Sequence, residues 1–357
     1  NISFLRVRAM AQAPDGTSLH DADVFQATEL EGLPSELDLR RGLNAIGDEL
    51  TKMAAAPIGD SYDGPVLFEP RAAAQLFAQV LGDNLKVTRR PISEGRRQVP
   101  YIPSELENKI GSRIMPDWMD VVDDPGQKEW RGQQLVGHFE FDSEGVQAKP
   151  LNIIEKGVLK DVLLTRTPVS KELDKSNGRA RLHGRFGADA PGFGNLFVRA
   201  SQTASAADLK AKLIAMIKQR NKPYGIVIRK LDFPSSMSVD ELRRLATAMG
   251  QSGDTRPVSV PLLVYRVYPD GKEELVRGLR FRGLSTKSFR DIAAATDETY
   301  VLNFLDSTVP LALMGVGSFA VNATVVAPGV LFEEMELERI QEDRPKLPIV
   351  PPPTLGT

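Results

Sequence analysis

Apolar positions along the chain recur with two different spacings, which together predict a mixture of helices and strands. Between Ser35 and Pro57, leucine, isoleucine and methionine recur every three or four residues, as on the buried face of an amphipathic helix. A second helix is predicted over residues 71–82, because Pro70 suits the first turn and Gly82 suits a terminator. Two more helices are predicted from capping pairs, Ser205 with Asp208 and Ser238 with Glu241.

Shorter apolar runs predict strands. Residues 64–68 form a continuous apolar run, and residues 135–142 alternate between apolar and polar side chains, as a half-buried strand does. Turn residues at positions 155–157 and 269–271 predict two hairpins. Strands are also predicted at residues 2–10, 225–231 and 311–332, and loops at the polar segments 86–109 and 174–195. Runs of strands interrupted by helices favour the α+β class.

The composition excludes several kinds of site. The 357 residues include 47 acidic and 45 basic side chains, a formal net charge of −2, which argues against a general nucleic-acid binder. Cysteine is absent, so disulfides, thiolate zinc sites and a cysteine nucleophile are excluded within this chain. Only His20, His138 and His183 are available for histidine chemistry. No apolar run reaches the roughly 18 residues of a transmembrane helix.

Two polar segments are candidate sites. Asp142 and Glu144 follow a predicted strand and flank a turn at Gly145, so they could share one face and bind a cation or a peptide amine. The alternative is a polar strand end with a glycine turn. The segment Ser176-Asn177-Gly178-Arg179 combines a turn that tolerates positive φ with an arginine that could hold a carboxylate. The alternative there is a connecting loop with solvated arginines.

Several short motifs follow one another in a distinctive order between residues 60 and 200. They are Gly64-Pro65-Val66-Leu67, the alanine-rich helix 71–82, Lys109-Ile110-Gly111, Val121-Val122-Asp123-Asp124, the 142–146 turn, the 154–160 hairpin, Ser176–Arg179 and Asn195-Leu196. Each is weak alone, but their order and spacing resemble the TldD/PmbA family. That family was historically called a modulator of DNA gyrase and is regarded as metallopeptidase-like. The resemblance implies an α+β fold of curved, mainly antiparallel sheets flanked by helices.

The resemblance also implies a zinc site whose ligands this sequence lacks. Active subunits of the family resemble zinc peptidases with a His-Glu-x-x-x-His motif on the helix after the Gly-Pro-Val strand, completed by a distant cysteine. Here the histidine positions hold Ala78 and Asp83, the glutamate position holds Gln79, and the cysteine position falls near Met314. Alanine cannot ligate zinc, glutamine cannot take up a proton, and a lone aspartate would bind zinc weakly. We therefore expect no metal and no other cofactor.

The resemblance is closest to the PmbA-type subunits, also called TldE, which lack the zinc motif. It implies a pseudo-enzyme that binds or guides peptide or unfolded polypeptide, as a homodimer or as a heterodimer with a TldD-type subunit, with no nucleic-acid partner. The candidate peptide-binding residues are Asp142, Glu144, Gly145, Ser176, Asn177, Gly178, Arg179, His183 and Asn195. Two alternatives stay open. One is an active hydrolase with a relocated site at Asp142, Glu144 and His183 with a metal, and the other is a structural or self-assembling protein.

The sequence predicts three parts. Residues 1–60 are expected to be a linking strand and helix next to an N-terminal domain that this sequence lacks, residues 61–340 a TldD/PmbA C-terminal-like domain, and residues 341–357 a proline-rich extended tail. The family implies the cytoplasm, whereas a leader in the missing N-terminal part would imply the periplasm or export.

Overall fold

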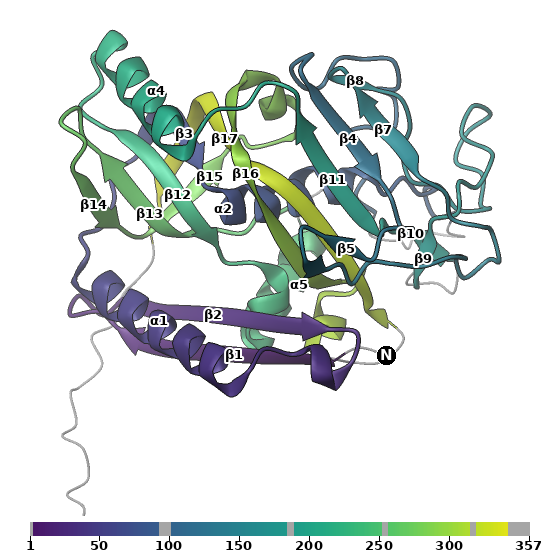
Figure 1. The fold of residues 1–357 in the computed structure, drawn as a ribbon, viewed down its shortest axis with the longest axis horizontal. Coiled ribbons are helices and arrows are strands. Elements are labelled where there is room, and N and C mark those ends of the chain that lie inside the picture. The colour runs from purple at the N-terminus through teal and green to yellow at the C-terminus, as the bar shows by residue number, and fades with distance from the viewer. Residues whose placement is uncertain (1–2, 93–100, 184–188, 252–255, 315–318, 342–357) are drawn as a thin grey trace, which may run out of the picture.

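A single long strand, β17 (Val321–Arg339), organises the main sheet. In the computed structural model, which describes residues 3–92, 101–183, 189–251, 256–314 and 319–341, four strands pair with it. It pairs antiparallel with β16 (Ile292–Asp306), β3 (Tyr62–Phe68) and β15 (Leu279–Arg282), and parallel with β11 (Asn195–Ala200) (Figure 1). The sheet continues beyond β3 through β12 (Gly225–Leu231), β13 (Pro261–Val267) and β14 (Glu273–Val276), and beyond β11 through β4 (Met119–Asp123), β7 (Leu151–Glu155) and β8 (Val158–Leu159).

This large mixed sheet with flanking helices confirms the α+β prediction. Most neighbouring strands are antiparallel, and the parallel pairs are β3 with β12 and β11 with β17. In the described part of the chain, no helix is both long enough and apolar enough to cross a membrane.

One face of the sheet buries the helical segment of residues 70–85. It consists of α2 (Pro70–Leu76), a π-helical turn η2 (Phe77–Gly82) and a last turn α3 (Asp83–Leu85). The prediction that Gly82 ends this helix is wrong, since the helix continues for three residues. Gly82 is needed for packing instead, because a Cβ there would lie 2.7 Å from the ring of Phe193.

The opposite face of the sheet is covered by α4 (Ala206–Gln219). Leu67 and Leu331 pack with this helix, whereas their sequence neighbours Phe68 and Phe332 belong to the main core. Side chains of a strand alternate between faces, so both strands are buried on each side. Ser205 caps α4 by accepting a hydrogen bond from the backbone N–H of Asp208 (3.1 Å), as predicted.

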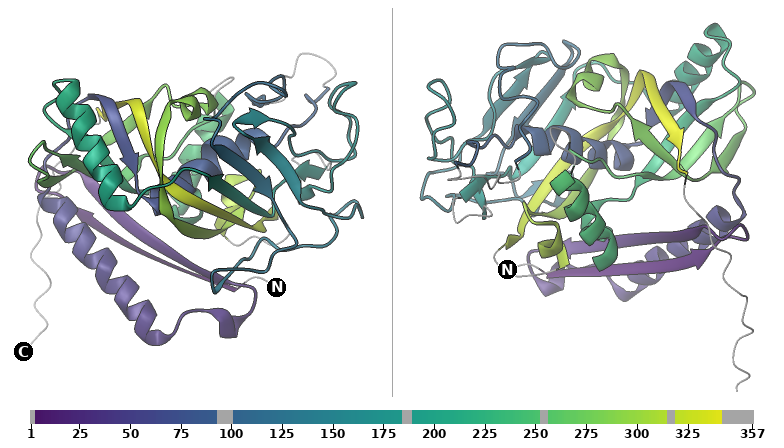
Figure 2. Two further views of the ribbon diagram at one scale, coloured as in Figure 1. Left: turned by 45° about the horizontal axis from the view of Figure 1, so that its top comes forward. Right: turned by 180° about the vertical axis from the view of Figure 1, so that it is seen from behind.

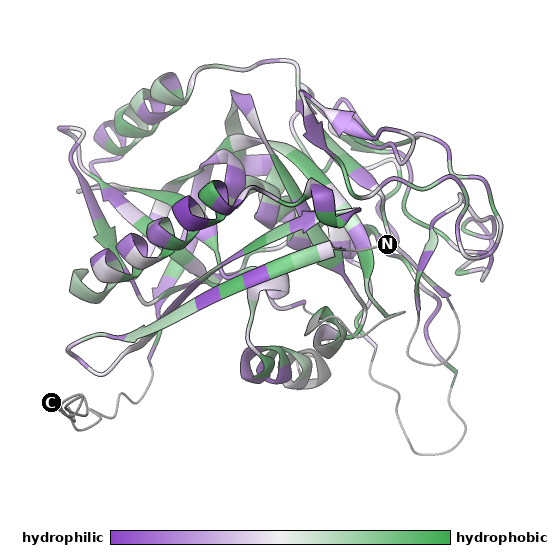
Figure 3. Ribbon diagram, turned by 60° about the horizontal axis from the view of Figure 1, so that its bottom comes forward, coloured by the Kyte–Doolittle hydropathy of each residue, from purple (hydrophilic) through white to green (hydrophobic). Residues whose placement is uncertain are grey.

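The N-terminal residues form a separate layer below the main sheet (Figures 1 and 2). Strands β1 (Ser3–Gln12) and β2 (Ser18–Ala27) pair as a hairpin, followed by the short turn η1 (Leu30–Gly32) and by α1 (Glu36–Ala55), with Ser35 as its N-cap. The sequence predicts the first strand and the helix but not β2. α1 carries hydrophilic and hydrophobic residues interspersed along its length, as Figure 3 shows.

Shorter elements complete the described structure. They are β5 (Glu129–Trp130), β6 (Gln133–Gln134), β9 (Ala180–His183), β10 (Asp189–Pro191), η3 (Pro234–Ser236), α5 (Val239–Gln251), η4 (Thr286–Asp291) and η5 (Pro310–Met314). The capping box predicted for α5 is present, because Ser238 and Glu241 exchange backbone-to-side-chain hydrogen bonds.

Three local predictions are wrong. Residues 135–142 form no regular strand, because the chain there turns to bring Gly137 against the backbone of Gly194 and His138 Nδ1 to 2.7 Å from the carbonyl oxygen of Pro125. The described part of the predicted loop 174–195 includes β9 and β10. The strand predicted at residues 311–332 is the third, because Pro310–Met314 form η5 and β17 begins at Val321. The described part of segment 86–109 is a loop as predicted, although Leu106 in it is fully buried, and residues 93–100 lie outside the described residues.

Candidate functional site

A cavity of about 230 Å³ opens beside the helical segment of residues 70–85. Ala78 and Asp83 both line it. These positions are five residues apart on the π-helical turn η2 and its continuation, and the i to i+5 hydrogen bonding of such a turn brings positions five apart onto one face. The apolar part of the wall comes from distant segments: Ile102, Pro191, Phe233, Leu245, Phe304 and Leu313.

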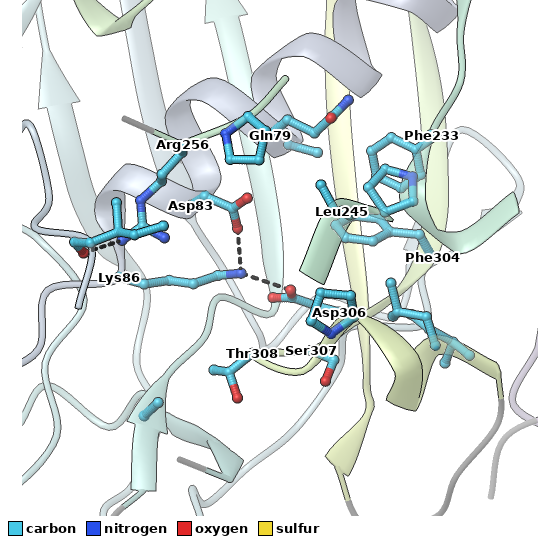
Figure 4. A pocket seen from close by; sticks show the side chains of 18 of the residues that line it. Gln79, Asp83, Lys86, Phe233, Leu245, Arg256, Phe304, Asp306, Ser307 and Thr308 are labelled. Atoms are coloured by element: carbon cyan, nitrogen blue, oxygen red, sulfur yellow. Dashed lines mark hydrogen bonds and ion pairs between the residues drawn. The ribbon is translucent and has the colours of Figure 1, made fainter. Parts of the chain in front are cut away.

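Lys86 lies at the polar end of this cavity, between two carboxylates. Its Nζ is 2.7 Å from Asp83 Oδ1 and 2.7 Å from Asp306 Oδ1 (Figure 4). The Lys86 and Asp306 side chains are only 10% and 8% exposed, whereas Asp83 is 39% exposed. Burial alone would lower the pKa of Lys86, but the charges of Asp306 and Asp83 outweigh it and raise that pKa. Lys86 is therefore an ammonium ion at neutral pH.

Asp306 keeps one unused acceptor at the cavity. Its Oδ2 atom is buried, and no group in the described structure donates a hydrogen bond to it. Arg181 lies close enough to Asp306 to interact with its charge, but one of its N–H groups donates to the carbonyl oxygen of Phe193 (2.5 Å). Burial lowers the pKa of Arg181 to about 10, so this guanidinium also stays charged at neutral pH. A buried carboxylate oxygen without a donor favours a ligand that brings an N–H group.

Gln79, at the glutamate position of the motif, is held by hydrogen bonds within the fold. Gln79 Oε1 accepts hydrogen bonds from the backbone N–H (3.0 Å) and hydroxyl (2.7 Å) of Ser259, and its Nε2 donates to the carbonyl oxygen of Gln75 (3.2 Å). Ala78 offers only a methyl group. Met314 ends η5, next to Leu313 of the cavity wall, but its side chain lies outside the described residues. Of the four motif positions, Asp83 alone presents a ligating atom in the described structure, and Lys86 occupies one of its oxygens.

Arg179, the charged residue of the second candidate segment, is wholly buried. Its Nε is 2.5 Å from Asp123 Oδ2, and both side chains are 0% exposed. Its other nitrogens donate to the carbonyl oxygens of Asn177 (2.8 Å) and Lys149 (2.7 Å). Asp123 Oδ1 accepts from the backbone N–H of Gly194 (2.9 Å). All these groups are satisfied inside the protein, so Arg179 is not available to a ligand.

The neighbouring predicted residues are also held by internal bonds. Asn177 bridges Leu164 N–H and the Val162 carbonyl oxygen. Asn195 donates to the carbonyl oxygens of Asp124 and Gln127, although its buried Oδ1 has no donor in the described structure. Gly178 has a φ of +74°, and a Cβ there would lie 2.8 Å from a backbone oxygen. Ser176 accepts a hydrogen bond from Gly178 N–H. This segment is a tight turn whose polar groups stabilise its own backbone.

The turn at residues 142–146 is built in the same way. Asp142 is 7% exposed, and its carboxylate accepts hydrogen bonds from the backbone N–H groups of Glu144, Val146 and Ala180. Glu144 accepts from Arg166 N–H (2.6 Å), and Gly145 supplies the positive φ of +73° that the turn needs. Asp142 therefore fixes the turn.

His183 is an exposed member of the predicted set. Its side chain is 47% exposed, and Nδ1 is 3.5 Å from Asp189 Oδ1. The Thr308 hydroxyl, which lines the cavity, donates to the His183 carbonyl oxygen (2.8 Å). His183 thus lies next to the cavity rim. Among the described residues, it does not form a metal-binding group of three with Asp142 and Glu144, so the relocated site finds no geometric support.

The described structure does contain one group of three possible ligands, which the sequence reasoning missed. His20 on β2 lies 3.1 Å from Asp232 Oδ2 and 3.3 Å from Glu241 Oε1. Glu241 Oε1 is also 2.5 Å from an Arg8 guanidinium nitrogen, and that fixed positive charge disfavours a cation at the same oxygen. Asp232 and Glu241 are 9 positions apart, but His20 lies 212 and 221 positions before them, so no local spacing signals the group.

Comparisons with known proteins place the chain among metallopeptidase relatives. A model of the PmbA/TldA metallopeptidase C-terminal domain matches residues 61–339. The Metalloprotease PmbA of Escherichia coli O157:H7 is 30% identical over 116 residues, which cover 32% of this chain and 22% of that protein. A protein named Metalloprotease from Archaeoglobus fulgidus is 34% identical over 79 residues, which cover 22% of this chain and 17% of that protein. The matches thus span less than a quarter of either curated relative.

Solved structures share the fold at low sequence identity. TldE from Thermococcus kodakarensis matches with a TM-score of 0.58 and 14% identity, over 94% of this chain and 63% of that one. A candidate modulator of a DNA gyrase from Thermotoga maritima matches with a TM-score of 0.55 and 17% identity, over 94% of this chain and 62% of that one. At such identities the likeness establishes the fold alone.

Proposed function

Because the chain belongs to the TldD/PmbA family of metallopeptidase-like proteins, we propose that it is a metal-free member whose cavity beside Lys86 binds peptide for a proteolytic partner. The observation that carries this proposal is a cavity at the motif helix whose metal-ligand positions hold Ala78, Gln79 and Asp83. In this proposal the cavity at the motif helix binds the ligand, while the side chains at the metal-ligand positions differ from those that would hold a metal and activate water.

The size and lining of the cavity suit part of a peptide. Pockets that enclose a drug-sized molecule measure about 300–1,000 Å³ and combine apolar walls with a few polar groups. At about 230 Å³ this cavity is smaller, and it fits a side chain of an extended polypeptide. Phe233 and Phe304 supply apolar contact, and Asp306, whose buried Oδ2 has no donor in the described structure, is the acceptor proposed for a peptide N–H. Of the sequence-predicted contacts, His183 is exposed and lies next to the cavity, so it is the one proposed to take part.

Peptide binding is the first experiment. We expect a fluorescently labelled, unstructured peptide with apolar side chains to raise its anisotropy on binding the chain. Leu245→Ser, which removes part of the apolar cavity wall, should weaken binding about tenfold or more, since burying a leucine side chain is worth about 1.5–3 kcal/mol. The matched control is Leu37→Ser, because Leu37 is 58% exposed on α1 and does not line the cavity.

A partner assay tests the second half of the proposal. Adding the chain to a homologue that carries His-Glu-x-x-x-His should increase proteolysis of the same peptide, and Leu245→Ser should reduce the gain. Equal binding by the Leu245 and Leu37 variants would move the binding site elsewhere. No binding and no gain in proteolysis would overturn the proposal, and a large homopolymer on sizing would then favour an assembly role.

A further inference from the structure

Lys86, Asp83 and Asp306 together form a compact charge cluster. Both carboxylate oxygens lie 2.7 Å from the same ammonium nitrogen, so they are close to each other as well. Asp306 is 8% exposed, and two carboxylates at such a place repel strongly unless a cation lies between them. The fold therefore requires a positive charge at this point (Figure 4).

A metal ion does not fit the described residues as that cation. Ala78 has no ligand atom, Gln79 spends its oxygen on Ser259, and Asp83 Oδ1 already contacts Lys86. A zinc site needs about three protein ligands. Among the described residues that line this cavity, the only carboxylate or imidazole ligands are Asp83 and Asp306, and the ammonium lies against both of them.

We propose that the Lys86 ammonium supplies, from within the chain, the positive charge that a bound metal supplies in the metallopeptidase members of the family. It holds Asp83 and Asp306 together and excludes divalent cations, so the cavity stays open for ligand in the absence of metal. Lys86 is a positioning residue in this account. The inference concerns the charge cluster and holds whether or not the ligand is a peptide.

The test replaces the internal cation with an external one. Lys86→Ala leaves two facing carboxylates, so its melting temperature should fall by several degrees in chelator, and Zn²⁺ or Mn²⁺ should restore much of the loss. The wild-type protein should show no such response. Lys109→Ala, which removes an exposed lysine, is the matched control and should behave as wild type. In the triple variant Lys86→Ala/Asp83→Asn/Asp306→Asn, the response to metal should disappear.

Asp83→Asn keeps the test decisive if Lys86→Ala does not fold. Asp83 is 39% exposed, so this variant is expected to fold. Calorimetric zinc titrations of wild type and Asp83→Asn should be the same, because neither holds zinc in the cavity, and metal bound at any other site appears in both. Zinc binding by wild type that Asp83→Asn abolishes would overturn the inference, as would a folded Lys86→Ala variant that responds to metal no more than wild type.

Discussion

Two buried cations, Arg179 and Lys86, have similar partners but opposite access. Arg179 pairs with Asp123 where both side chains are 0% exposed, and its nitrogens have further acceptors. Lys86 pairs with two carboxylates at the end of a cavity, and Asp306 Oδ2 has no donor in the described structure. The comparison teaches that a buried charge alone does not mark a site. A buried polar atom without a partner, on a residue that lines a cavity, is the better signal.

The largest expected effect is at Arg179, whose ion pair with Asp123 is enclosed in the protein interior. Arg179→Met leaves Asp123 charged and unpaired in the interior, so we expect the free energy of unfolding to fall by about 3–5 kcal/mol. Urea denaturation measures this, with Arg166→Met as the control because Arg166 is exposed. A loss under about 1 kcal/mol would mean that water reaches Asp123, and that the Arg179 pair and the Lys86 cluster do not differ in their access to water.

Lys86→Ala should lower the free energy of unfolding by less than Arg179→Met does. Asp83 is 39% exposed and the cavity admits water, so the two carboxylates can be partly solvated after the lysine is removed. We expect a loss of about 1–3 kcal/mol in the same urea experiment, in metal-free buffer. A loss of free energy of unfolding equal to that of Arg179→Met would show that the carboxylates beside Lys86 are as inaccessible to water as Asp123.

The carboxylates beside a third buried cation, Lys230, predict that stability depends on pH. Its Nζ is 2.5 Å from the buried Asp21 and 3.7 Å from Glu49, whose side chain is 32% exposed. Burial and a hydrogen bond with Asp21 raise the pKa of Glu49 from about 4.5 to about 7. The folded chain thus holds a proton that the unfolded chain releases between these values. Stability should fall as the pH rises from about 4.5 to about 7, and no further above that range.

Glu49→Gln should remove this part of the pH dependence, because glutamine does not titrate. Melting temperatures of the variant and of wild type, measured across that pH range, give the comparison. Asp48→Asn, which changes an exposed neighbour on the same helix, is the control. Parallel curves for wild type and Glu49→Gln would rule out Glu49 as the titrating group.

The smallest expected effect is at His183. Its side chain is 47% exposed and its carboxylate neighbour is 3.5 Å away, so His183→Ala should change stability by less than about 0.5 kcal/mol. Because His183 adjoins the cavity rim, the same variant should weaken peptide binding modestly. Unchanged binding would confine the ligand to the Lys86 side of the cavity.

Local patterns predicted the helices and the fold class well, because caps and apolar spacing are local properties. Ser205 and Ser238 cap α4 and α5 as expected, and Ser35 caps α1. The strand predicted at residues 135–142 is wrong, since their alternation suits a strand but long-range contacts to Pro125 and Gly194 decide their path. β2 was missed because its polar residues, among them Asp21 and Asp23, pair with Lys230 and Arg71 of the main body.

The candidate site was predictable only through the motif positions. Ala78, Gln79 and Asp83 are adjacent in sequence, and they lie at a cavity. Lys86 could not be recognised from the sequence as part of a site, because its partner Asp306 lies 220 residues away. Arg179 had the sequence character of a ligand-binding residue, but its partner Asp123 lies 56 positions earlier and makes it internal. Partners distant in sequence therefore decide which charged residues face a ligand.

The most direct test of the central claim is peptide binding to the chain in excess chelator, compared with binding in added Zn²⁺. The account predicts the same affinity in both conditions, because Lys86 and not a metal completes the cavity. It also predicts that Leu245→Ser weakens binding equally in both. Binding that appears only with Zn²⁺ and that Asp83→Asn abolishes would contradict the account.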